Sequence, residues 1–337
     1  MPTSAVRKPS VPAPATLEPL LSLVKADMLA VNDVILGSIS DDVPLIRRIA
    51  EHIIASGGKR LRPSLTIACA KLCGHEGTRQ IGLAAAVELI HTATLLHDDV
   101  VDESTLRRGN ETANAIWSNQ ASVLVGDFLL SRAFQLMVAD GSIPILKVLS
   151  DASATISKGE VMQLAAANDS TTSEEHYLAI IGAKTAALFA AATEIGAIMA
   201  DRDHYRQSLR EYGEYLGIAF QLMDDALDYS ADPQKLGKAV GDDFREGKLT
   251  LPVIIAYREG SSEEQAFWKR TLEDANQRDD DLAQAIQYIQ KYDAVARAVQ
   301  KAAEYAQRAE DILGALPANE ARDALIATAR FCANREF

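Results

Sequence analysis

The chain has 337 residues, of which 48% are hydrophobic, so it is long enough to bury a large core. Its formal net charge of -13 argues against nucleic acid or an anionic membrane surface as the main partner, because both require a basic face. The three cysteines fit a reducing cytoplasm better than a disulfide framework, so we expect a cytoplasmic protein. Cys69 and Cys73 lie one helical turn apart without a second pair at zinc-site spacing, and we interpret them as buried core thiols.

The predicted elements follow a proline-rich segment. Residues 1–16 contain four prolines and few apolar residues, so we expect a disordered tail without the apolar core of a signal peptide. Over residues 17–337 apolar residues recur at helical spacing, and stretches that alternate with a period of two are missing. We therefore predict an all-α fold with one domain over this range. No uninterrupted apolar run is as long as a membrane span, which predicts no integral membrane segment.

The helical periodicity predicts fourteen helices, whose ends are accurate to about 2–4 residues. In chain order they are expected at 17–36, 45–56, 63–73, 79–103, 111–118, 121–139, 143–168, 173–200, 203–230, 250–258, 262–275, 279–290, 293–314 and 319–332. Thr172 with Glu175 and Ser261 with Glu264 have the spacing of capping boxes, in which the first side chain caps the helix N-terminus.

The first loop with unusual chemistry is 56–63, with the sequence Ser-Gly-Gly-Lys-Arg-Leu-Arg-Pro. Its paired glycines let the backbone approach a ligand closely. Three cations, Lys59, Arg60 and Arg62, project from nearby positions, as the binding of a compact polyanion requires. A basic surface beside a glycine turn at a helix end is the alternative, and this loop alone does not decide between them.

Two acidic pentads of one form are the most informative feature of the chain. Residues 98–102 read Asp-Asp-Val-Val-Asp and residues 224–228 read Asp-Asp-Ala-Leu-Asp, and each pentad follows a long apolar helical stretch. Positions i, i+1 and i+4 project toward one side of a helix, so each pentad is expected to gather three carboxylates at the end of its helix. Carboxylates that combine with phosphate oxygens suit Mg²⁺, which indicates a magnesium diphosphate held from two sides. A single pentad would be interpreted as a solvated acidic helix end, but two copies after apolar turns favour the rim of an apolar cavity.

Two further loops carry cations near the pentads. Arg107 and Arg108 follow the first pentad closely enough to contact the same diphosphate, although pairing with Asp102 and Glu103 is an alternative that stays open for Arg107. The loop 230–248 contains three glycines, a proline and four cations, and we interpret it as a mobile cationic flap over the second pentad. Asp242 in this flap is a candidate for a further metal-binding carboxylate.

From residue 20 to the C-terminus, the chain resembles the trans-isoprenyl (polyprenyl) diphosphate synthases, and among them the long-chain octaprenyl, nonaprenyl and decaprenyl group. The motifs that carry the resemblance occur in the family's order, at 57–63, 91–102, 107–109, 126–127, 184–185, 221–228, 237–238 and 247–248. The resemblance implies a single all-helical domain of the isoprenoid synthase type with a deep central cavity, usually dimeric. It therefore implies that residues 17–337 form a polyprenyl synthase catalytic domain and that the protein is a homodimer.

The resemblance also implies roles for individual residues. Asp98, Asp102 and Asp224 are similar to the ligands of three Mg²⁺ ions in the family, with Asp99, Asp225 and Asp228 in support. The allylic diphosphate is expected to contact Arg107, Lys184, Thr185, Gln221, Lys238 and Lys248, and Lys184 and Lys238 are counted with the aspartates as catalytic residues. Isopentenyl diphosphate is expected to contact Gly58, Lys59, Arg62, His91 and Arg108. For His91, a hydrogen-bonded core residue is the alternative.

Product length is expected to depend on the residues one turn below the first pentad. Ala93 and Thr94 lie roughly 6–7.5 Å beneath Asp98 at the rise of an α-helix. Short-chain members of the family have bulky aromatic residues at these positions, so the small residues here imply a long product. Octaprenyl, nonaprenyl and decaprenyl diphosphate all fit, as precursors of a quinone side chain such as that of ubiquinone, and farnesyl diphosphate is the expected primer.

Three alternatives to this function exist. A terpene cyclase of the same fold is contradicted by the intact second pentad, because that group carries an Asn/Ser/Glu arrangement there. A shorter-chain synthase of the geranylgeranyl type is a second alternative. A non-catalytic partner subunit of a heteromeric prenyl synthase is the third, and the presence of all the expected acids and cations argues against it.

Overall fold

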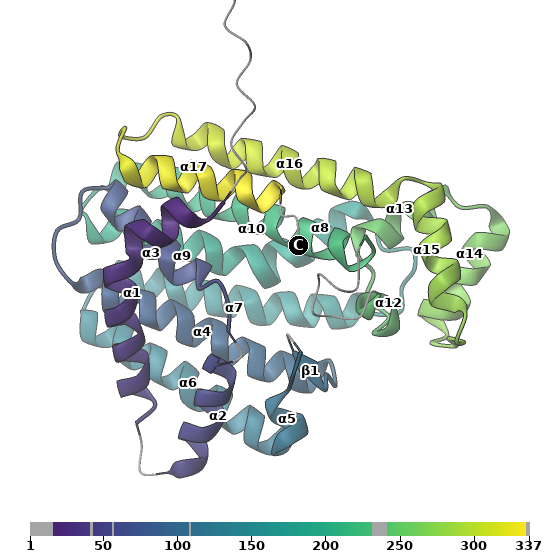
Figure 1. Ribbon diagram of the computed structural model, residues 1–337, viewed down its shortest axis with the longest axis horizontal. Helices are drawn as coiled ribbons and strands as arrows, with labels where there is room; N and C mark the ends of the chain where they lie inside the picture. The colour runs from purple at the N-terminus through teal and green to yellow at the C-terminus, as the bar shows by residue number, and fades with distance from the viewer. Residues whose placement is uncertain (1–15, 41–42, 56, 108, 231–240, 335–337) are drawn as a thin grey trace, which may run out of the picture.

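The computed structural model describes residues 16–40, 43–55, 57–107, 109–230 and 241–334, and it is almost entirely helical (Figure 1). The α-helices are α1 (Glu18–Ser38), α2 (Pro44–Ala55), α3 (Leu61–Leu72), α4 (Arg79–Val101), α5 (Ala113–Ile116), α6 (Asn119–Asp140), α7 (Ile143–Ala166), α8 (Glu174–Ile181), α9 (Ala187–Met199), α10 (Arg206–Asp228), α12 (Asp242–Arg245), α13 (Leu251–Glu259), α14 (Ser262–Trp268), α15 (Asp281–Lys291), α16 (Ala294–Leu313) and α17 (Glu320–Ala333). Shorter elements are the π-helical turns η1 (Gly182–Ala186) and η3 (Lys269–Glu273), the 3₁₀ turn η2 (Asp203–Tyr205), and the strands β1 (Leu106–Arg107) and β2 (Asn110–Glu111). The all-α prediction is confirmed.

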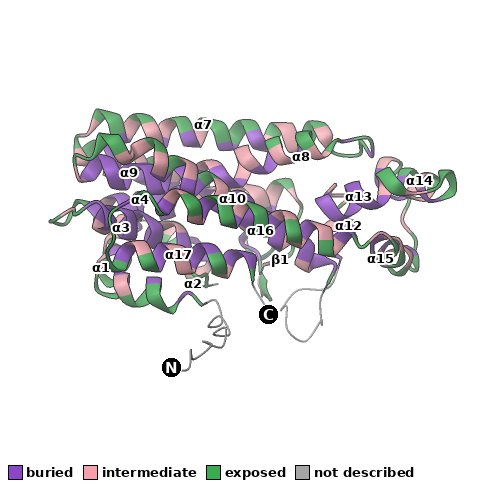
Figure 2. Cartoon of the chain, turned by 90° about the horizontal axis from the view of Figure 1, so that it is seen from above, coloured by how far each residue is buried: buried purple, intermediate pink, exposed green. Residues whose placement is uncertain are grey.

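The long helices form a bundle with α3, α4 and α9 at its centre and α7 on its outside (Figure 2). Helix α9 is buried along its whole length, and small residues let its neighbours approach closely. A Cβ at Gly196 would lie 2.6 Å from the Cβ of Cys69 on α3, and one at Gly217 on α10 would lie 2.6 Å from the Cα of Ala186. Cys69 and Cys73 are both buried in this core, as expected of core thiols.

Four details differ from the elements expected from the sequence. The predicted helix 173–200 is interrupted by η1, and 262–275 changes to a π-helical turn at η3. Strands β1 and β2 pair antiparallel in a two-residue hairpin that periodicity could not reveal. Ser173, not Thr172, caps α8, because its side chain accepts a hydrogen bond from the backbone N–H of His176. The capping box of Ser261 and Glu264 is present as predicted.

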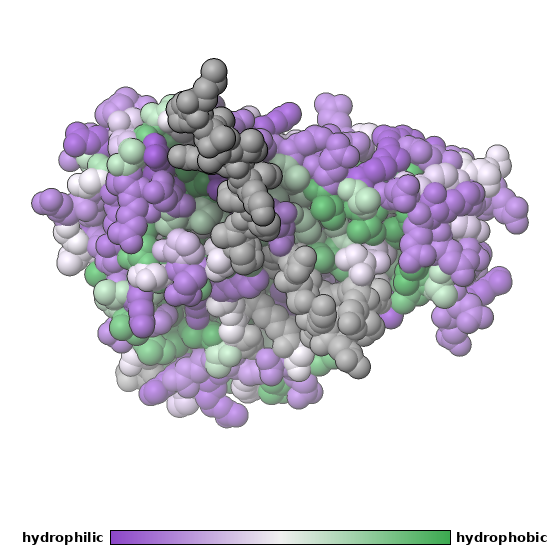
Figure 3. All heavy atoms as spheres, turned by 45° about the horizontal axis from the view of Figure 1, so that its top comes forward, coloured by the Kyte–Doolittle hydropathy of each residue, from purple (hydrophilic) through white to green (hydrophobic). Residues whose placement is uncertain are grey.

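Two helical segments are long and apolar enough to cross a membrane by length and composition. Glu174–Met199 is the buried centre of the bundle, whereas only a third of the most apolar part of Asn119–Asp140 is buried. Charged residues interrupt both segments, Lys184 and Glu194 in the first and Asp127 and Arg132 in the second, so neither is an uninterrupted apolar run. The molecular face in Figure 3 is mostly hydrophilic, with apolar side chains in smaller groups between charged ones.

Candidate active site

The two acidic pentads lie at the ends of α4 and α10 and are linked through the segment that contains α12. Asp228 of the second pentad accepts a hydrogen bond from the backbone N–H of Asp243, at 3.1 Å. Lys248 follows α12, and its Nζ lies 2.9 Å from Oδ2 of Asp102 in the first pentad. Residues that are far apart in the sequence are therefore brought to one site, as the resemblance implied.

Each pentad turns its second aspartate away from the site. Asp99 is only 1% exposed and forms an ion pair with Arg107, and the Nε–Oδ1 distance is 2.7 Å. Asp225 is buried as well and accepts hydrogen bonds from the hydroxyl of Tyr177 and the side-chain amide of Gln221. The expectation that each pentad presents three carboxylates on one side is therefore wrong for the i+1 positions. A rotation of about 100° per residue carries these side chains toward partners inside the bundle.

Lysines lie beside the two partly exposed carboxylates of the first pentad, Asp98 and Asp102. Lys184 Nζ donates to Glu160 Oε2 at 2.7 Å and lies 3.9 Å from Asp98 Oδ2. Burial raises the pKa of Asp98 to about 7, although the charge of Lys184 opposes this shift and Glu160 and Asp102 add to it. Burial opposes the charged form of Lys248, but Asp102 and nearby acids outweigh it and raise the pKa of the ammonium group. Both shifts have the direction expected of a site that favours added positive charge.

The donor set fits a metal that shares its shell with a ligand. Within the described ranges, no three His, Cys, Asp or Glu side chains lie close enough to form a metal site of protein ligands alone. Asp98, Asp102 and Asp224 are partly exposed carboxylates on two different helices. Mg²⁺ keeps several waters and commonly uses one or two carboxylates together with substrate phosphate oxygens. Residues of this kind can hold Mg²⁺ when a diphosphate completes the shell.

A basic cavity of about 350 Å³ lies next to the first pentad, between the loop 57–62, α4, α9 and α10. Gly58, Lys59, Arg62 and His91 all line it, so the structure brings together four of the five residues expected to bind the second diphosphate. Arg62 Nη1 lies 3.1 Å from His91 Nε2. The guanidinium of Arg62 lies over the ring of Phe189, 4.4 Å from its centroid. The fifth residue, Arg108, lies outside the described residues.

Arg60 has a different role from its two cationic neighbours in the loop. Its guanidinium forms an ion pair with Glu88, which is buried one helical turn before His91 on α4. The backbone of Arg60 has a φ of 46°, in the left-handed region that few non-glycine residues adopt. This contact ties the residue that precedes α3 to α4. Sequence reasoning missed Glu88 because nothing in α4 marks it as the partner of a distant arginine.

The π-helical turn η1 carries Lys184 and Thr185 into the site. A π-turn inserts an extra residue into a helix, and such turns are frequent at functional sites. Helix α7 packs directly against it, because a Cβ at Gly159 would lie 2.6 Å from the backbone nitrogen of Lys184. Glu160, the next residue of α7, then meets the Lys184 ammonium group. Glu160 was missed from the sequence, where a Gly-Glu pair within a helix is only a weak signal.

The described part of the predicted flap, 241–248, is held in place. Phe244 on α12 is buried, and the backbone of Asp243 is bound to Asp228. The sequence-based choice of Asp242 as an added metal carboxylate finds no support, because Asp242 pairs with Arg245 at 2.8 Å. Asp243 is the acid near the second pentad, and burial, Asp225 and Asp228 raise its pKa well above its usual range. Lys238, and with it the rest of the flap, lies outside the described residues.

The two expected chain-length residues differ in exposure. Ala93 is fully buried in the main core, whereas Thr94 is half-buried and donates a hydrogen bond from its hydroxyl to the backbone carbonyl of His91. Both are small side chains directly below the first pentad on α4. Their effect on product length stays a prediction.

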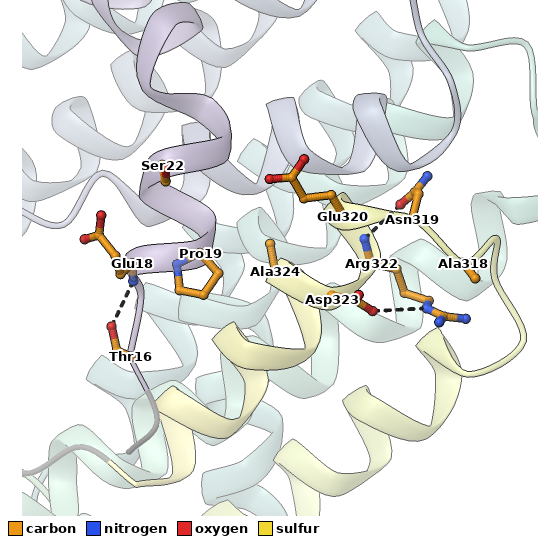
Figure 4. Close-up of a pocket in the computed structure, with 10 residues that line it drawn as sticks. All are labelled: Thr16, Glu18, Pro19, Ser22, Ala318, Asn319, Glu320, Arg322, Asp323 and Ala324. Atoms are coloured by element: carbon orange, nitrogen blue, oxygen red, sulfur yellow. Dashed lines mark hydrogen bonds and ion pairs between the residues drawn. The ribbon is translucent and has the colours of Figure 1, made fainter. Parts of the chain in front are cut away.

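A larger, open hollow of about 850 Å³ lies between the first turns of α1 and α17 (Figure 4). Three acids, Glu18, Glu320 and Asp323, line it with one arginine, Arg322. The arginine Nη1 donates to the carbonyl of Leu316 at 3.3 Å. A hollow with this acidic lining does not suit a diphosphate, so the candidate active site is the one between the pentads and the basic cavity.

Comparisons with known proteins show which family the chain is similar to. A sequence profile of the family described as polyprenyl synthetase matches residues 43–289. The octaprenyl diphosphate synthase of Escherichia coli is 44% identical over 321 residues, which are 95% of this chain and 99% of that protein. The crystal structure of a polyprenyl synthase from Caulobacter crescentus, complexed with calcium and isoprenyl diphosphate, has a TM-score of 0.93 and 48% identity and covers 96% of this chain and 99% of its own. A decaprenyl diphosphate synthase from Rhodobacter capsulatus has a TM-score of 0.91 and 46% identity, with 95% of this chain and all of that chain covered.

The fold and the site together define an all-helical isoprenoid synthase. The two acidic helix ends and the basic cavity lie in one helical bundle, and the solved structures share that fold over nearly their whole length. The chain belongs to the polyprenyl synthetase family. The resemblance expected from the sequence motifs is therefore confirmed, and the roles of individual residues stay predictions.

Proposed function

We propose that this protein is a long-chain all-trans polyprenyl diphosphate synthase, a prenyltransferase that extends an allylic diphosphate with successive isopentenyl diphosphates. The observation that carries this proposal is the juxtaposition of two acidic helix ends with a separate cavity that contains Lys59, Arg62 and His91. One diphosphate fits between the acids, and a second fits the basic cavity. The similarity to octaprenyl and decaprenyl synthases over nearly full length supports the long-chain class.

The allylic diphosphate would bind between Asp98 and Asp102 on one side and Asp224 on the other, with three magnesium ions as proposed for the family. When bound, Mg²⁺ supplies positive charge that stabilises the diphosphate as it leaves. Lys184 and Lys248 are within reach to exchange their present carboxylate partners for phosphate oxygens. Arg107 is held beside the site by Asp99. Lys238 is proposed to contribute a further cation.

The reaction follows from the charges in the two sites. The allylic C–O bond breaks, its electron pair goes to the diphosphate, and the carbocation is attacked by the double bond of isopentenyl diphosphate. The second substrate would be oriented by Lys59, Arg62 and His91, with Arg108 and the backbone of Gly58 in support. The adduct then loses a proton, for which we propose the departed diphosphate as the base, and a new allylic diphosphate five carbons longer results. Water must be excluded during this step, and the buried Phe244 anchors the segment that would cover the second pentad.

The product is proposed to be octaprenyl or decaprenyl diphosphate, for the side chain of a quinone such as ubiquinone, with farnesyl diphosphate as the primer. The small side chains of Ala93 and Thr94 are proposed to leave room for a growing chain along α4. We further propose that residues 17–337 form one catalytic domain and that the protein is cytoplasmic. Of the expected N-terminal tail, residues 1–15 lie outside the described residues.

We also propose that the protein is a homodimer that pairs through α6. Val123, Leu124 and Val138 are exposed on this helix, and Leu124 is 66% exposed. A helix with several large apolar side chains in solvent is typical of an interface between subunits. This face also explains why α6 resembles a membrane span in composition.

The activity is tested with the purified protein, Mg²⁺, farnesyl diphosphate and labelled isopentenyl diphosphate, followed by chromatographic sizing of the product. We expect a prenyl diphosphate of eight to ten isoprene units. A product of four units would identify the shorter-chain alternative. Absence of any condensation by the protein on its own would support the non-catalytic partner subunit and contradict the proposal.

A further inference from the structure

Tyr177 on α8 is a fully buried tyrosine beside the active site to which the proposed reaction gives no role. It is 3% exposed, and its hydroxyl donates to Oδ2 of Asp225, the inward-facing aspartate of the second pentad. A buried hydroxyl requires a partner, but a backbone carbonyl would serve that need equally well. Its pairing with a carboxylate next to the site therefore needs an explanation.

The hydrogen bond from Tyr177 is the first link of a chain that reaches the π-turn. Oδ1 of Asp225 accepts from Nε2 of Gln221, one turn earlier on α10, at 2.7 Å. Oε1 of Gln221 in turn accepts from the hydroxyl of Thr185, at 2.9 Å. Four side chains from α8, α10 and η1 are thus joined, and donation converges on Asp225, from Tyr177 on one side and from Thr185 through Gln221 on the other.

This chain fixes the orientation of the Gln221 amide. Both oxygens of the Asp225 carboxyl group accept hydrogen bonds, Oδ2 from Tyr177 and Oδ1 from Gln221, so the NH₂ group of Gln221 faces Asp225 and its amide oxygen faces Thr185. The NH₂ group has a second hydrogen that can be donated to a phosphate oxygen. The hydroxyl of Thr185 donates its single hydrogen to Gln221 in this structure. In this arrangement the amide is the donor, and Asp225 and Thr185 hold it from two sides.

We propose that Tyr177 is a positioning residue for the allylic diphosphate, acting through Asp225 on the amide of Gln221. Tyr177 does not touch the substrate. It holds the Asp225 carboxylate in the rotamer that accepts from Gln221, and this keeps the second amide hydrogen directed toward the diphosphate. The proposal rests on the proposed function and deepens it by adding a residue that controls one of its two substrate sites.

The test compares two buried tyrosines whose hydroxyls donate to different partners. Tyr177→Phe removes the hydrogen bond to Asp225. The control, Tyr212→Phe, removes an equally buried hydroxyl on α10 that donates to the backbone carbonyl of Leu325. Both variants should lose a similar amount of thermal stability, because each loses one buried hydrogen bond. Only Tyr177→Phe should raise the KM for farnesyl diphosphate, by about tenfold as for a lost bond to a charged group, with the KM for isopentenyl diphosphate unchanged.

A double-mutant cycle tests whether the effect passes through Gln221. In a Gln221→Met background, which has no amide to orient, Tyr177→Phe should change the KM for farnesyl diphosphate by less than about twofold. Full additivity of the two effects would overturn the proposal. So would a Tyr177→Phe enzyme whose kinetics match those of Tyr212→Phe, or one in which only the KM for isopentenyl diphosphate rises. Turnover by the wild-type enzyme tests the proposed function separately, so failure of the one is distinguishable from failure of the other.

Discussion

Neighbouring residues of the same type have different roles in this site. Asp98 and Asp224 remain partly exposed, whereas Asp99 and Asp225 face inward to partners from other elements. Helical spacing predicted that both pentads would lie at helix ends, but it also placed all three carboxylates of each pentad on one side, which is wrong for Asp99 and Asp225. The direction of these two side chains depends on Arg107, in the hairpin, and on contacts from α8, and no local pattern in the sequence identifies such partners.

Replacement of Arg62 by alanine tests the second substrate site. Arg62 lies beside His91 in the basic cavity, so its loss should chiefly raise the KM for isopentenyl diphosphate. A lost charge-assisted hydrogen bond costs roughly 1.5–3 kcal/mol, or about ten- to hundredfold. Steady-state kinetics with each substrate varied in turn measure the effect. If only the KM for the allylic substrate changed, the assignment of the two diphosphates would have to be exchanged.

At the scale of elements, the long helices were predictable and their interruptions were not. The apolar periodicity of α4, α6, α7 and α10 is continuous, so their positions followed from the sequence. The π-turn η1 lies within an equally apolar stretch, and an extra residue in one turn does not change that pattern. The close packing of Gly159 against the turn is a tertiary effect. For this reason Lys184 could be selected by resemblance, while its partner Glu160 could not.

Helix α4 is expected to form a wall of the path along which the product grows. Ala93→Tyr places a phenol ring one turn below the first pentad and should shorten the product to roughly three or four isoprene units, without loss of the first condensations. Because Ala93 is fully buried, the melting temperature must show that the variant is folded. Thr94→Phe, at the half-buried neighbour, should shorten the product as well. Unchanged long products from both folded variants would mean that the chain elongates along a different helix.

The N-terminus of α14 provides a test of stability that is independent of the active site. Hydrogen bonds from Lys291 and Tyr292, and the capping bond to Ser261, lower the pKa of Glu264 from 4.5 to about 2. A lowered pKa means that this stabilisation is fully present above about pH 4.5 and is lost as the pH falls toward 2. Glu264→Gln should therefore lower the free energy of unfolding by about 1 kcal/mol at pH 7.

The difference between this variant and the wild type should shrink steadily below pH 4.5, as measured by urea unfolding at a series of pH values. Glu263→Gln is the matched control, since Glu263 is an exposed acid in the same first turn of α14. It should have little effect on the urea midpoint at any pH. An equal loss of stability for both variants at pH 7 would contradict the network around Glu264.

At the scale of the whole molecule, the class of fold and the residues of the site could be predicted from the sequence. The contacts that connect the two pentads could not. The presence of two similar pentads in the sequence is the only ground for predicting that they bind one ligand from two sides. In the structure, α12 and Lys248 make that connection, within a segment that the sequence presented as a flexible flap. Glycine content indicated a loop there, and the anchoring by Phe244 could be recognised only with the rest of the core in place.

The proposed dimer is tested by a charge on the outer face of α6. Leu124→Arg should convert a dimer of about 73 kDa, twice the chain mass of 36.4 kDa, into a monomer, because an unpaired buried charge costs several kcal/mol at an interface. Sedimentation equilibrium measures the mass directly. Leu29→Arg on α1 is the control, since Leu29 is similarly exposed on a different helix. If the wild type is a monomer, or if Leu29→Arg alone dissociates it, α6 is not the interface.

The central claim is that the acids of α4 and α10 together hold a magnesium diphosphate. The most direct measurement is calorimetric binding of a farnesyl diphosphate analogue that cannot ionise, with and without Mg²⁺, to the wild type, Asp98→Asn and Asp224→Asn. We expect tight binding to the wild type only in the presence of Mg²⁺, and a loss of that Mg²⁺-dependent binding in each variant, with the melting temperature unchanged or raised. Binding that is independent of Mg²⁺, or Mg²⁺-dependent binding that is normal in either folded variant, would contradict the account.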